Sequence, residues 1–448
     1  MKKTVIAIFL FATIFGFSLF AQAKNEKPQA EQVRTITWWH NSSGLAGKAA
    51  EAMVEEFNSS VGREQNIRVE AIYQGKASDV LTKVKAIFQS GTNNGLPDLV
   101  QLDGSGVLDI RDNEYLISME KLAKEDSFDL SVILDSARLS VTYKADMIAM
   151  PFNSSTIMLY YNKSAFDEAG IPKPPRNLDE LALTATKLKQ TDAKGKVLRY
   201  GIANVPTTYE LTVWLGHQNG VSYLTDKENG HTGIPTRVLF HENGTMVKFL
   251  TKWKALYATG SLENLTSDVN GAFASGKVAM MVASTSNLST VIQMVGDRFE
   301  LGVAPFPMVD EQATGGVNVG GGALYALDNG SGNQAETWEF VKFATSKEQQ
   351  LDWHIATGYF PVNEGTYSME AFQNHLEENP LYGVAIRQLK ASNPQLQGVW
   401  IPSAYQIYYA FQTGILKMLL EDKSPEETSK GLEREINTYL EDYVRMTR

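Results

Sequence analysis

Hydrophobic positions along the chain follow two alternating spacings, and this alternation predicts an α/β fold. Short apolar runs typical of buried strands are followed by stretches whose apolar residues recur at helical spacing. The first strands are expected at Thr35–Trp39, Ile67–Tyr73 and Asp98–Leu102, separated by helices at Ala46–Phe57 and Ser78–Phe88. Strands joined through helices are typical of βαβ units, so a sheet with parallel strands is expected.

The later chain repeats the pattern and ends in helices. A strand is expected at Leu159–Tyr161, followed by a helix at Leu178–Leu188 with Asn177 as its N-cap. Two late strands suggest a return to an earlier sheet. They are expected at Leu301–Pro307 and Ala323–Leu327, and the helices after them at Thr337–Ala344, Lys347–His354, Tyr405–Leu420 and Pro425–Tyr443. The polar segment Thr225–Arg237, with two glycines and a proline, is expected to form a surface loop.

The N-terminus has the pattern of a cleavable export signal. Lys2 and Lys3 precede an apolar run, Val5–Phe20, and Ala21-Gln22-Ala23 provides a small-x-small cleavage site. A membrane-spanning helix needs about 20 apolar residues, so the shorter run favours a cleaved signal over a retained anchor. No cysteine follows the cleavage site, so no lipid anchor is expected. We therefore expect residues 1–23 to be removed and the mature protein to diffuse in the periplasm.

Composition excludes several classes of function. The chain has 448 residues, enough for two domains, and it contains no cysteine, which excludes thiol nucleophiles, iron–sulfur clusters and cysteine-ligated zinc. The formal charge is −10, and loss of the two signal lysines makes it more negative. An acidic surface does not favour nucleic acid or anionic lipid as a partner.

Catalytic and nucleotide-binding motifs are weak or absent. Gly271–Lys277 has the spacing of a phosphate loop, but Val278 replaces the required hydroxyl residue, and the expected helix precedes the expected strand. The six histidines are scattered, so no metal site is expected and no cofactor is implied. A pair of carboxylates could still serve a secreted glycosidase, and this alternative stays open.

Aromatic and small hydroxyl residues gather at the ends of expected strands. Trp38-Trp39-His40 ends the first strand and is followed by Asn41-Ser42-Ser43-Gly44. Similar polar runs occur at Asn153-Ser154-Ser155-Thr156 and Ser284-Thr285-Ser286-Asn287. Ligands of open α/β sheets lie beyond the carboxyl ends of strands, where such residues suit polyols or anions. Plain helix capping explains each run equally well.

The segment Pro151–Phe166 resembles the family 1 extracellular solute-binding proteins of ABC importers. Further matching stretches are Trp39-His40, Pro97-Asp98, Phe273-x-x-Gly276-x-x-Ala279-Met280, Gly320-Gly321 and Trp353-His354-x-x-Thr357-Gly358-Tyr359-x-Pro361. The resemblance spans the mature chain and implies a type II periplasmic binding protein fold, with two α/β lobes, a hinge between them and a helical C-terminal region. It places 24–152 plus 304–345 in the N-terminal lobe and 153–303 plus 346–448 in the C-terminal lobe.

The resemblance also implies which residues bind the solute. Ser155 and Ser284 would donate hydroxyls, Gly321 a backbone N–H, and Tyr359 an aromatic face with a phenol. Asp103, Tyr408 and Trp39 are further candidates.

Three positions depart from the family pattern. Ala77 and Gly104 stand where the family has a tyrosine and a glutamate, and Tyr408 stands where it has a phosphate-pairing arginine. Arg387 or Lys390 could approach instead. Tyrosine does not give the bidentate, charge-assisted grip of arginine.

The expected function is therefore that of the substrate-binding subunit of an ABC importer. It would capture a small polyol-type solute, glycerol-3-phosphate or a related glycerophosphodiester, and deliver it to membrane permease subunits. The protein itself is expected to be a monomer. Tyr408 and the aromatic set Trp38, Trp39, Trp214, Trp400 and Tyr405 favour a neutral sugar or oligosaccharide as the alternative. A chemosensory or adhesion module is a third interpretation.

Overall fold

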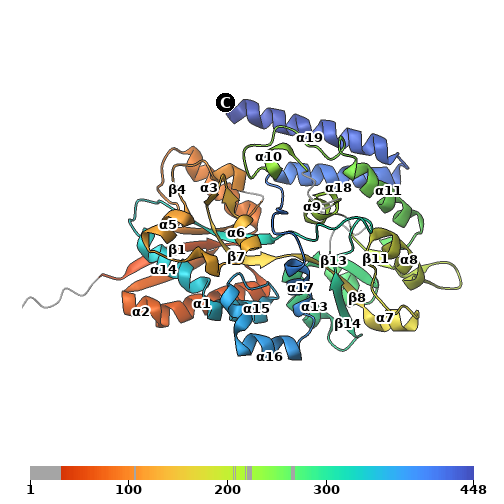
Figure 1. Ribbon diagram of the computed structural model, residues 1–448, viewed down its shortest axis with the longest axis horizontal. Helices are drawn as coiled ribbons and strands as arrows, with labels where there is room; N and C mark the ends of the chain where they lie inside the picture. Colours follow the sequence, from red (N-terminus) through yellow and green to blue (C-terminus); the bar gives the residue numbers. More distant parts are fainter. Residues whose placement is uncertain are drawn as a thin grey trace, which may run out of the picture.

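The computed structural model describes residues 32–447, apart from 105–106, 205, 207, 217, 219–223 and 264–267. The predicted signal, residues 1–23, lies outside the described residues. The described chain forms two lobes, each built on a β-sheet covered by helices (Figure 1). This confirms the predicted α/β class.

The first lobe is built on a six-stranded sheet with the strand order β2-β1-β3-β15-β4, in which β7 also pairs with β15. Its strands are β1 (Arg34–His40), β2 (Ile67–Tyr73), β3 (Leu99–Asp103), β4 (Leu116–Ile117), β7 (Met150–Ser155) and β15 (Gly320–Leu327). The strands β1, β2 and β3 are parallel, whereas β15 is antiparallel to β3. A late strand thus returns to the first sheet, as the sequence suggested.

The second lobe is built on a five-stranded sheet with the order β12-β11-β13-β8-β14. Its strands are β8 (Ile157–Asn162), β11 (Ile202–Ala203), β12 (Leu262–Glu263), β13 (Met280–Ser284) and β14 (Leu301–Pro305). The strand β8 runs antiparallel to both neighbours. Two short hairpins lie apart from both sheets. They are β5 (Thr142–Tyr143) with β6 (Asp146–Met147), and β9 (Gln190–Thr191) with β10 (Val197–Arg199).

Helices connect the strands and cover the sheets. The first half contains α1 (Gly44–Ser59), α2 (Val61–Gln65), α3 (Ala77–Gln89), α4 (Val107–Ile110), α5 (Met119–Glu125), η2 (Leu130–Val132), α6 (Asp135–Leu139), α7 (Lys163–Glu168), α8 (Leu178–Leu188) and α9 (Thr208–Gly216). The second half contains α10 (Asp226–Asn229), α11 (Thr245–Ala258), α12 (Val269–Ala274), η3 (Thr285–Asn287), α13 (Leu288–Val295), α14 (Gln334–Ala344), α15 (Lys347–Thr357), η4 (Glu364–Ser368), α16 (Glu370–Glu378), α17 (Gly383–Lys390), α18 (Ala404–Leu420) and α19 (Pro425–Thr447).

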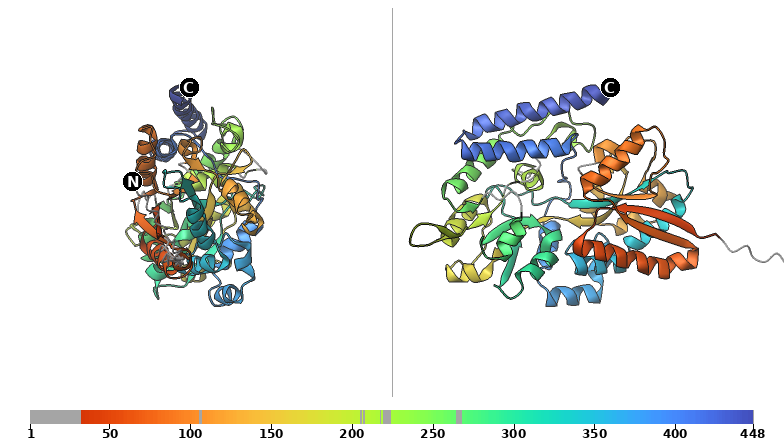
Figure 2. Two further views of the ribbon diagram at one scale, coloured as in Figure 1. Left: turned by 90° about the vertical axis from the view of Figure 1, so that its left-hand side faces the viewer. Right: turned by 180° about the vertical axis from the view of Figure 1, so that it is seen from behind.

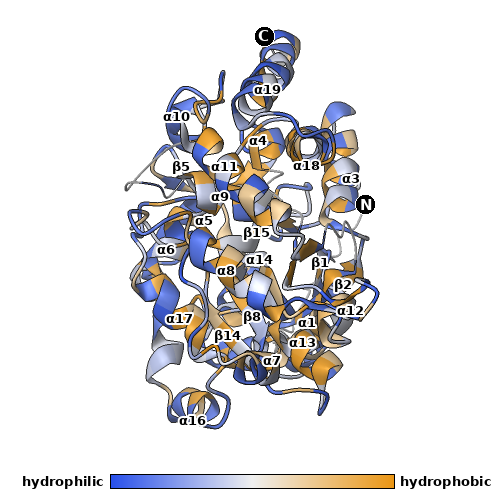
Figure 3. Cartoon of the chain, turned by 90° about the vertical axis from the view of Figure 1, so that its right-hand side faces the viewer, coloured by the Kyte–Doolittle hydropathy of each residue, from blue (hydrophilic) through white to orange (hydrophobic). Residues whose placement is uncertain are grey.

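Each lobe has its own hydrophobic core, because its helices turn apolar faces to its sheet. Trp38 and Phe57 belong to the first core, and Trp214 and Trp253 to the second. The C-terminal helices α18 and α19 lie side by side at one edge of the molecule, and α16 lies at the opposite edge (Figures 2 and 3). Within the described ranges, no helix unites the length and the apolar character that a membrane crossing would demand.

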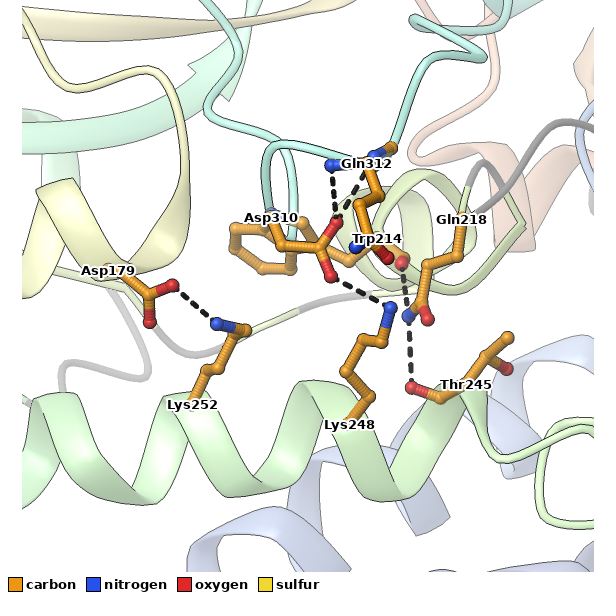
Figure 4. A network of polar contacts seen from close by, with 9 residues as sticks. Asp179, Trp214, Gln218, Thr245, Lys248, Lys252, Asp310 and Gln312 are labelled. Carbon is orange, nitrogen blue, oxygen red and sulfur yellow. Dashed lines mark hydrogen bonds and ion pairs between the residues drawn. The ribbon is translucent and has the colours of Figure 1, made fainter.

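A polar network anchors the segment that leaves the second sheet after β14. Lys248 on α11 pairs with Asp310 at 2.7 Å (Figure 4). The indole N–H of Trp214 donates to the carbonyl of Pro307 at 2.9 Å. Gln218 joins the carbonyls of Trp214 and Thr245 through its amide N–H groups. These bonds hold the start of the long connection from β14 to β15 on the second lobe.

The chain passes between the sheets at three neighbouring places. Only Thr156 separates β7 from β8, and its hydroxyl donates to the carbonyl of Asn318 just before β15. The N–H of Phe360 donates to the carbonyl of Ser154 at 3.1 Å. These crossings are bound to one another and form the connection around which the two lobes can hinge.

The lobe ranges implied by the resemblance, 24–152 plus 304–345 and 153–303 plus 346–448, stay a prediction. The helix α15 falls in the range predicted for the C-terminal lobe. It packs against α1 of the first lobe, and its Trp353 belongs to the first core.

Candidate functional site

A cavity of about 500 Å³ lies at the junction of the two lobes. The first lobe lines it with the end of β3, the strand β7 and the start of β15, through Leu102, Asp103, Gly104, Ser154, Gly321 and Tyr325. The other wall comes from α9, the segment 398–400 and α18, through Tyr209, Thr212, Trp400, Tyr405, Tyr408, Tyr409 and Gln412. A volume of this size suits a small solute.

Aromatic rings make up most of the wall opposite the first sheet. Trp400 is almost fully buried, whereas Tyr405 and Tyr409 on α18 are 40% and 70% exposed. The hydroxyl of Tyr209 lies 3.0 Å from the carbonyl of Ser155, and burial raises the pKa of this phenol. The cavity therefore offers flat faces for stacking both in its interior and at its margin.

Three consecutive glycines at the start of β15 form part of the cavity wall. Gly321 has a φ of +93°, and a Cβ there would lie 2.1 Å from the carbonyl oxygen of Asn153. A Cβ on Gly320 would lie 2.5 Å from the ring of Tyr209. Only glycine lets the ring and the neighbouring strand approach so closely, so the backbone itself faces the cavity.

The electrostatic character of the cavity is set by one carboxylate. Asp103 is the only charged side chain among the described lining residues. Burial raises the pKa of the Tyr408 and Tyr325 phenols, and the charge of Asp103 raises both further. Arg387 and Lys390 lie on α17, do not line the cavity, and the ammonium of Lys390 sits 4.5 Å from the ring centre of Tyr367. The internal stretches outside the described ranges contain no lysine, arginine, aspartate or glutamate.

A second, more polar recess of about 330 Å³ lies by the N-terminus of α1. Tyr359, Asn153 and Ser286 line it, together with the segment 41–46. The ring of Tyr359 lies 6.1 Å from that of Trp353, and its carbonyl lies 2.6 Å from Nδ1 of the buried His354. These contacts fix the position of the tyrosine at the rim of the recess.

The structure brings only some of the predicted site residues together. Asp103, Gly321 and Tyr408 line the main cavity, and Tyr359 lines the recess. Ser155 and Ser284 line neither space, although their neighbours Ser154 and Ser286 do. The hydroxyl of Ser284 accepts from the N–H of Ser286 at 3.3 Å, as expected for a cap. Half-buried Trp39, on β1, also lines neither space.

The aromatic set of the sequence divides between core and cavity. Trp38 and Trp214 are completely buried in the two cores and present no face to a solute. Trp400, Tyr405 and Tyr408 do line the cavity, and Trp400 also packs in the first core.

Tyr209, Tyr409 and Gln412 are lining residues that the sequence analysis missed. The signal for α18 was present, since Tyr405, Tyr408, Tyr409 and Gln412 follow helical spacing. Nothing in the sequence distinguishes Tyr209.

The site holds no obvious place for a metal. Across the described part of the chain, no three histidine, aspartate or glutamate side chains gather closely enough to bind an ion.

Comparisons with known proteins agree with this geometry. Residues 52–379 match the family described as bacterial extracellular solute-binding protein. The sn-glycerol-3-phosphate-binding periplasmic protein UgpB of Escherichia coli K12 is 26% identical over 414 residues, covering 89% of this chain and 90% of that protein. The same protein of Shigella flexneri is 25% identical over 412 residues, with 89% and 90% coverage.

Solved structures share the two-lobe fold. UgpB from Mycobacterium tuberculosis, in complex with glycerophosphocholine, superimposes with a TM-score of 0.76 at 22% identity, covering 92% of this chain and 99% of that one. The GacH receptor of Streptomyces glaucescens, studied with acarbose, gives a TM-score of 0.74 at 22% identity, with 92% and 100% coverage. These similarities confirm the predicted fold.

Proposed function

Because the chain belongs to the bacterial extracellular solute-binding proteins, the substrate-binding components of ABC importers, we propose that its main cavity takes a zwitterionic glycerophosphodiester. The observation that carries the proposal is the lining of the cavity: it contains several tyrosines, Trp400 and one carboxylate, Asp103, and no lysine or arginine among the described lining residues. A quaternary ammonium group is recognised by aromatic faces and a nearby negative charge. A glycerophosphodiester such as glycerophosphocholine carries that group and a polyol end.

Glycerol-3-phosphate itself fits this cavity less well. A phosphate monoester carries about −1.5 to −2 charges at pH 7. Those charges would lie near Asp103 without a basic side chain to pair them, and Tyr408 stands where the family pattern has arginine. The relatives that are named for glycerol-3-phosphate support the polyol part of the ligand, and the relative solved with glycerophosphocholine supports the diester.

A neutral sugar is the second candidate. The exposed rings of Tyr405 and Tyr409 lie at the margin of the cavity, where they could stack on sugar faces without any charge. The relative studied with acarbose has the same fold.

Isothermal titration calorimetry tests the proposal with three probes: glycerophosphocholine, glycerol-3-phosphate and maltotriose. We expect glycerophosphocholine to bind most tightly, and Asp103→Asn to weaken its binding about tenfold, since loss of a charge contact of about 1.4 kcal/mol corresponds to a factor of ten. Maltotriose binding would change little in the same variant. Asp422→Asn is the matched control, because Asp422 lies on the surface beside Lys254, away from the cavity.

The outcomes separate the candidates. Tighter binding of glycerol-3-phosphate than of glycerophosphocholine would contradict the proposal. Exclusive binding of maltotriose, unaffected by Asp103→Asn, would instead establish the sugar.

The cellular place of this function is also a proposal. The family is extracellular and the relatives are periplasmic proteins, which supports capture in the periplasm and delivery to membrane permease subunits. The roles predicted for Ser155 and Ser284 are not part of this proposal, since neither residue lines the cavity or the recess.

A further inference from the structure

The segment Thr225–Arg237 of the second lobe, predicted as a surface loop, is partly buried. It leaves the second core at Leu224 and returns at Val238, both of which are buried there. Asn229 is 4% exposed, and its side-chain carbonyl accepts from the N–H groups of Leu224 and Thr225 at 2.7 and 3.2 Å. These bonds give a polar segment one defined conformation.

This segment supports the cavity wall formed by residues 398–400. The N–H of Trp400 donates to the carbonyl of Asn229 at 2.7 Å. The imidazole of His231 stacks on the indole of Trp400, with ring centres 4.0 Å apart and planes 26° apart. Its Nε2 lies 3.0 Å from the carbonyl oxygen of Gly398. The indole that lines the cavity therefore stacks on His231, and it also packs in the first core.

The same histidine reaches the first lobe. Nδ1 of His231 lies 3.3 Å from the carbonyl oxygen of Thr142, and the N–H of Lys144 donates to the carbonyl of His231 at 3.1 Å. Both partners belong to the hairpin region β5–β6, whose Tyr143 packs in the first core and lies 6.3 Å from the ring of Trp400. His231 thus contacts both the wall of the cavity and the opposite lobe.

We propose that His231 is a positioning residue of the solute cavity: it holds the indole of Trp400 at the wall while joining the second lobe to the β5–β6 hairpin of the first. The proposal rests on the proposed function in that the main cavity is the solute site. This contact couples the position of the Trp400 ring to the distance between the two lobes. The solute needs to make no contact with His231 itself, because Trp400 is the residue that lines the cavity.

Fluorine NMR of protein labelled with 5-fluorotryptophan tests the positioning directly and without any solute. The chain has 7 tryptophans, and the signal of Trp400 is assigned from its loss in Trp400→Phe. We expect His231→Ala to shift and broaden that signal alone. His231→Phe, which keeps a flat ring against the indole, should restore it. His241→Ala is the control, since His241 belongs to the same lobe but bonds Ser429, away from the cavity.

Calorimetry with glycerophosphocholine and maltotriose then tests the consequence. We expect His231→Ala to weaken binding of the probe about tenfold, because the stacking ring of Trp400 loses the aromatic contact that positions it. His231→Phe should recover most of this loss, and thermal unfolding verifies that each variant is folded. An unchanged Trp400 signal in His231→Ala, or an unchanged affinity, would overturn the proposal. If neither probe binds the wild-type protein, the proposed function fails, and the Trp400 signal alone decides on His231.

Discussion

Gly321 shows how one residue shapes the wall of the cavity. Gly321 has a φ of +93°, and a Cβ added to it would lie 2.1 Å from the carbonyl oxygen of Asn153. Each property excludes a side chain for its own reason, since the first strains the backbone and the second causes overlap.

Substitution of Gly321 separates these two costs. Gly321→Ala should lower the free energy of unfolding by about 1–2 kcal/mol for the backbone conformation and by a further ~1–3 kcal/mol for the overlap. Gly195→Ala is the control, because Gly195 has a φ of +81° but no atom within 4 Å of the place where a Cβ would lie. Urea unfolding measures both variants, and equal losses would show that overlap at Gly321 contributes nothing.

The candidate residues illustrate what single positions in a sequence can predict. Gly321 was predicted from the Gly320-Gly321 run that resembles the family, whereas Tyr408 was predicted at a position where the family pattern has arginine. Ser154 lines the cavity, whereas the predicted Ser155 does not. Side chains alternate between the faces of a strand, so a shift of one position changes which space a residue faces. Trp38, Trp214 and Trp400 look alike in the sequence, since a large ring suits a core as well as a binding site. Only the packing of distant elements distinguishes them.

At the scale of elements, the strands and helices were largely predictable, whereas their partners were not. The predicted strands Thr35–Trp39 and Ile67–Tyr73 correspond to β1 and β2, and the predicted helix Leu178–Leu188 matches α8. The late strand β14 joins the second sheet and β15 joins the first, although β15 is the next strand after β14 in the sequence. Pairing of this kind depends on which edge of which sheet is free, and local periodicity does not record that.

The helix α15 carries a pH-dependent contribution to stability. His354 on this helix is 1% exposed, and burial lowers the pKa of His354 to about 4. The unfolded chain takes up the proton near its ordinary pKa of about 6.5, whereas the folded chain resists protonation until about pH 4. Stability should therefore fall as the pH drops from about 6.5 to 4, by up to about 3 kcal/mol from this group.

Urea unfolding at pH 7, 5.5 and 4.5 checks this expectation. The wild-type protein should lose more stability over this range than His354→Gln, which has no titrating ring. Parallel pH curves for the two proteins would contradict the assignment of the effect to His354.

At the scale of the whole molecule, the predicted export signal has a direct test. We expect protein recovered from the periplasm to begin at Lys24, because cleavage after Ala23 removes the apolar run that would otherwise hold the chain at the membrane. Intact-mass spectrometry measures the start point, and Ala23→Leu should slow processing. A recovered mass that includes residues 1–23 would refute cleavage.

The strands at the passage between the lobes have a consequence for which molecules can block the cavity. Gly320 and Gly321 belong to β15, which pairs with β7 at the passage between the lobes, so the wall of the solute cavity and the hinge share one backbone. Under the proposed function, a molecule that fills the cavity but prevents this backbone from reaching the closed arrangement would occupy the protein without being passed to the permease. For the cell, such a molecule would be a competitor that occupies the binding protein without being transported.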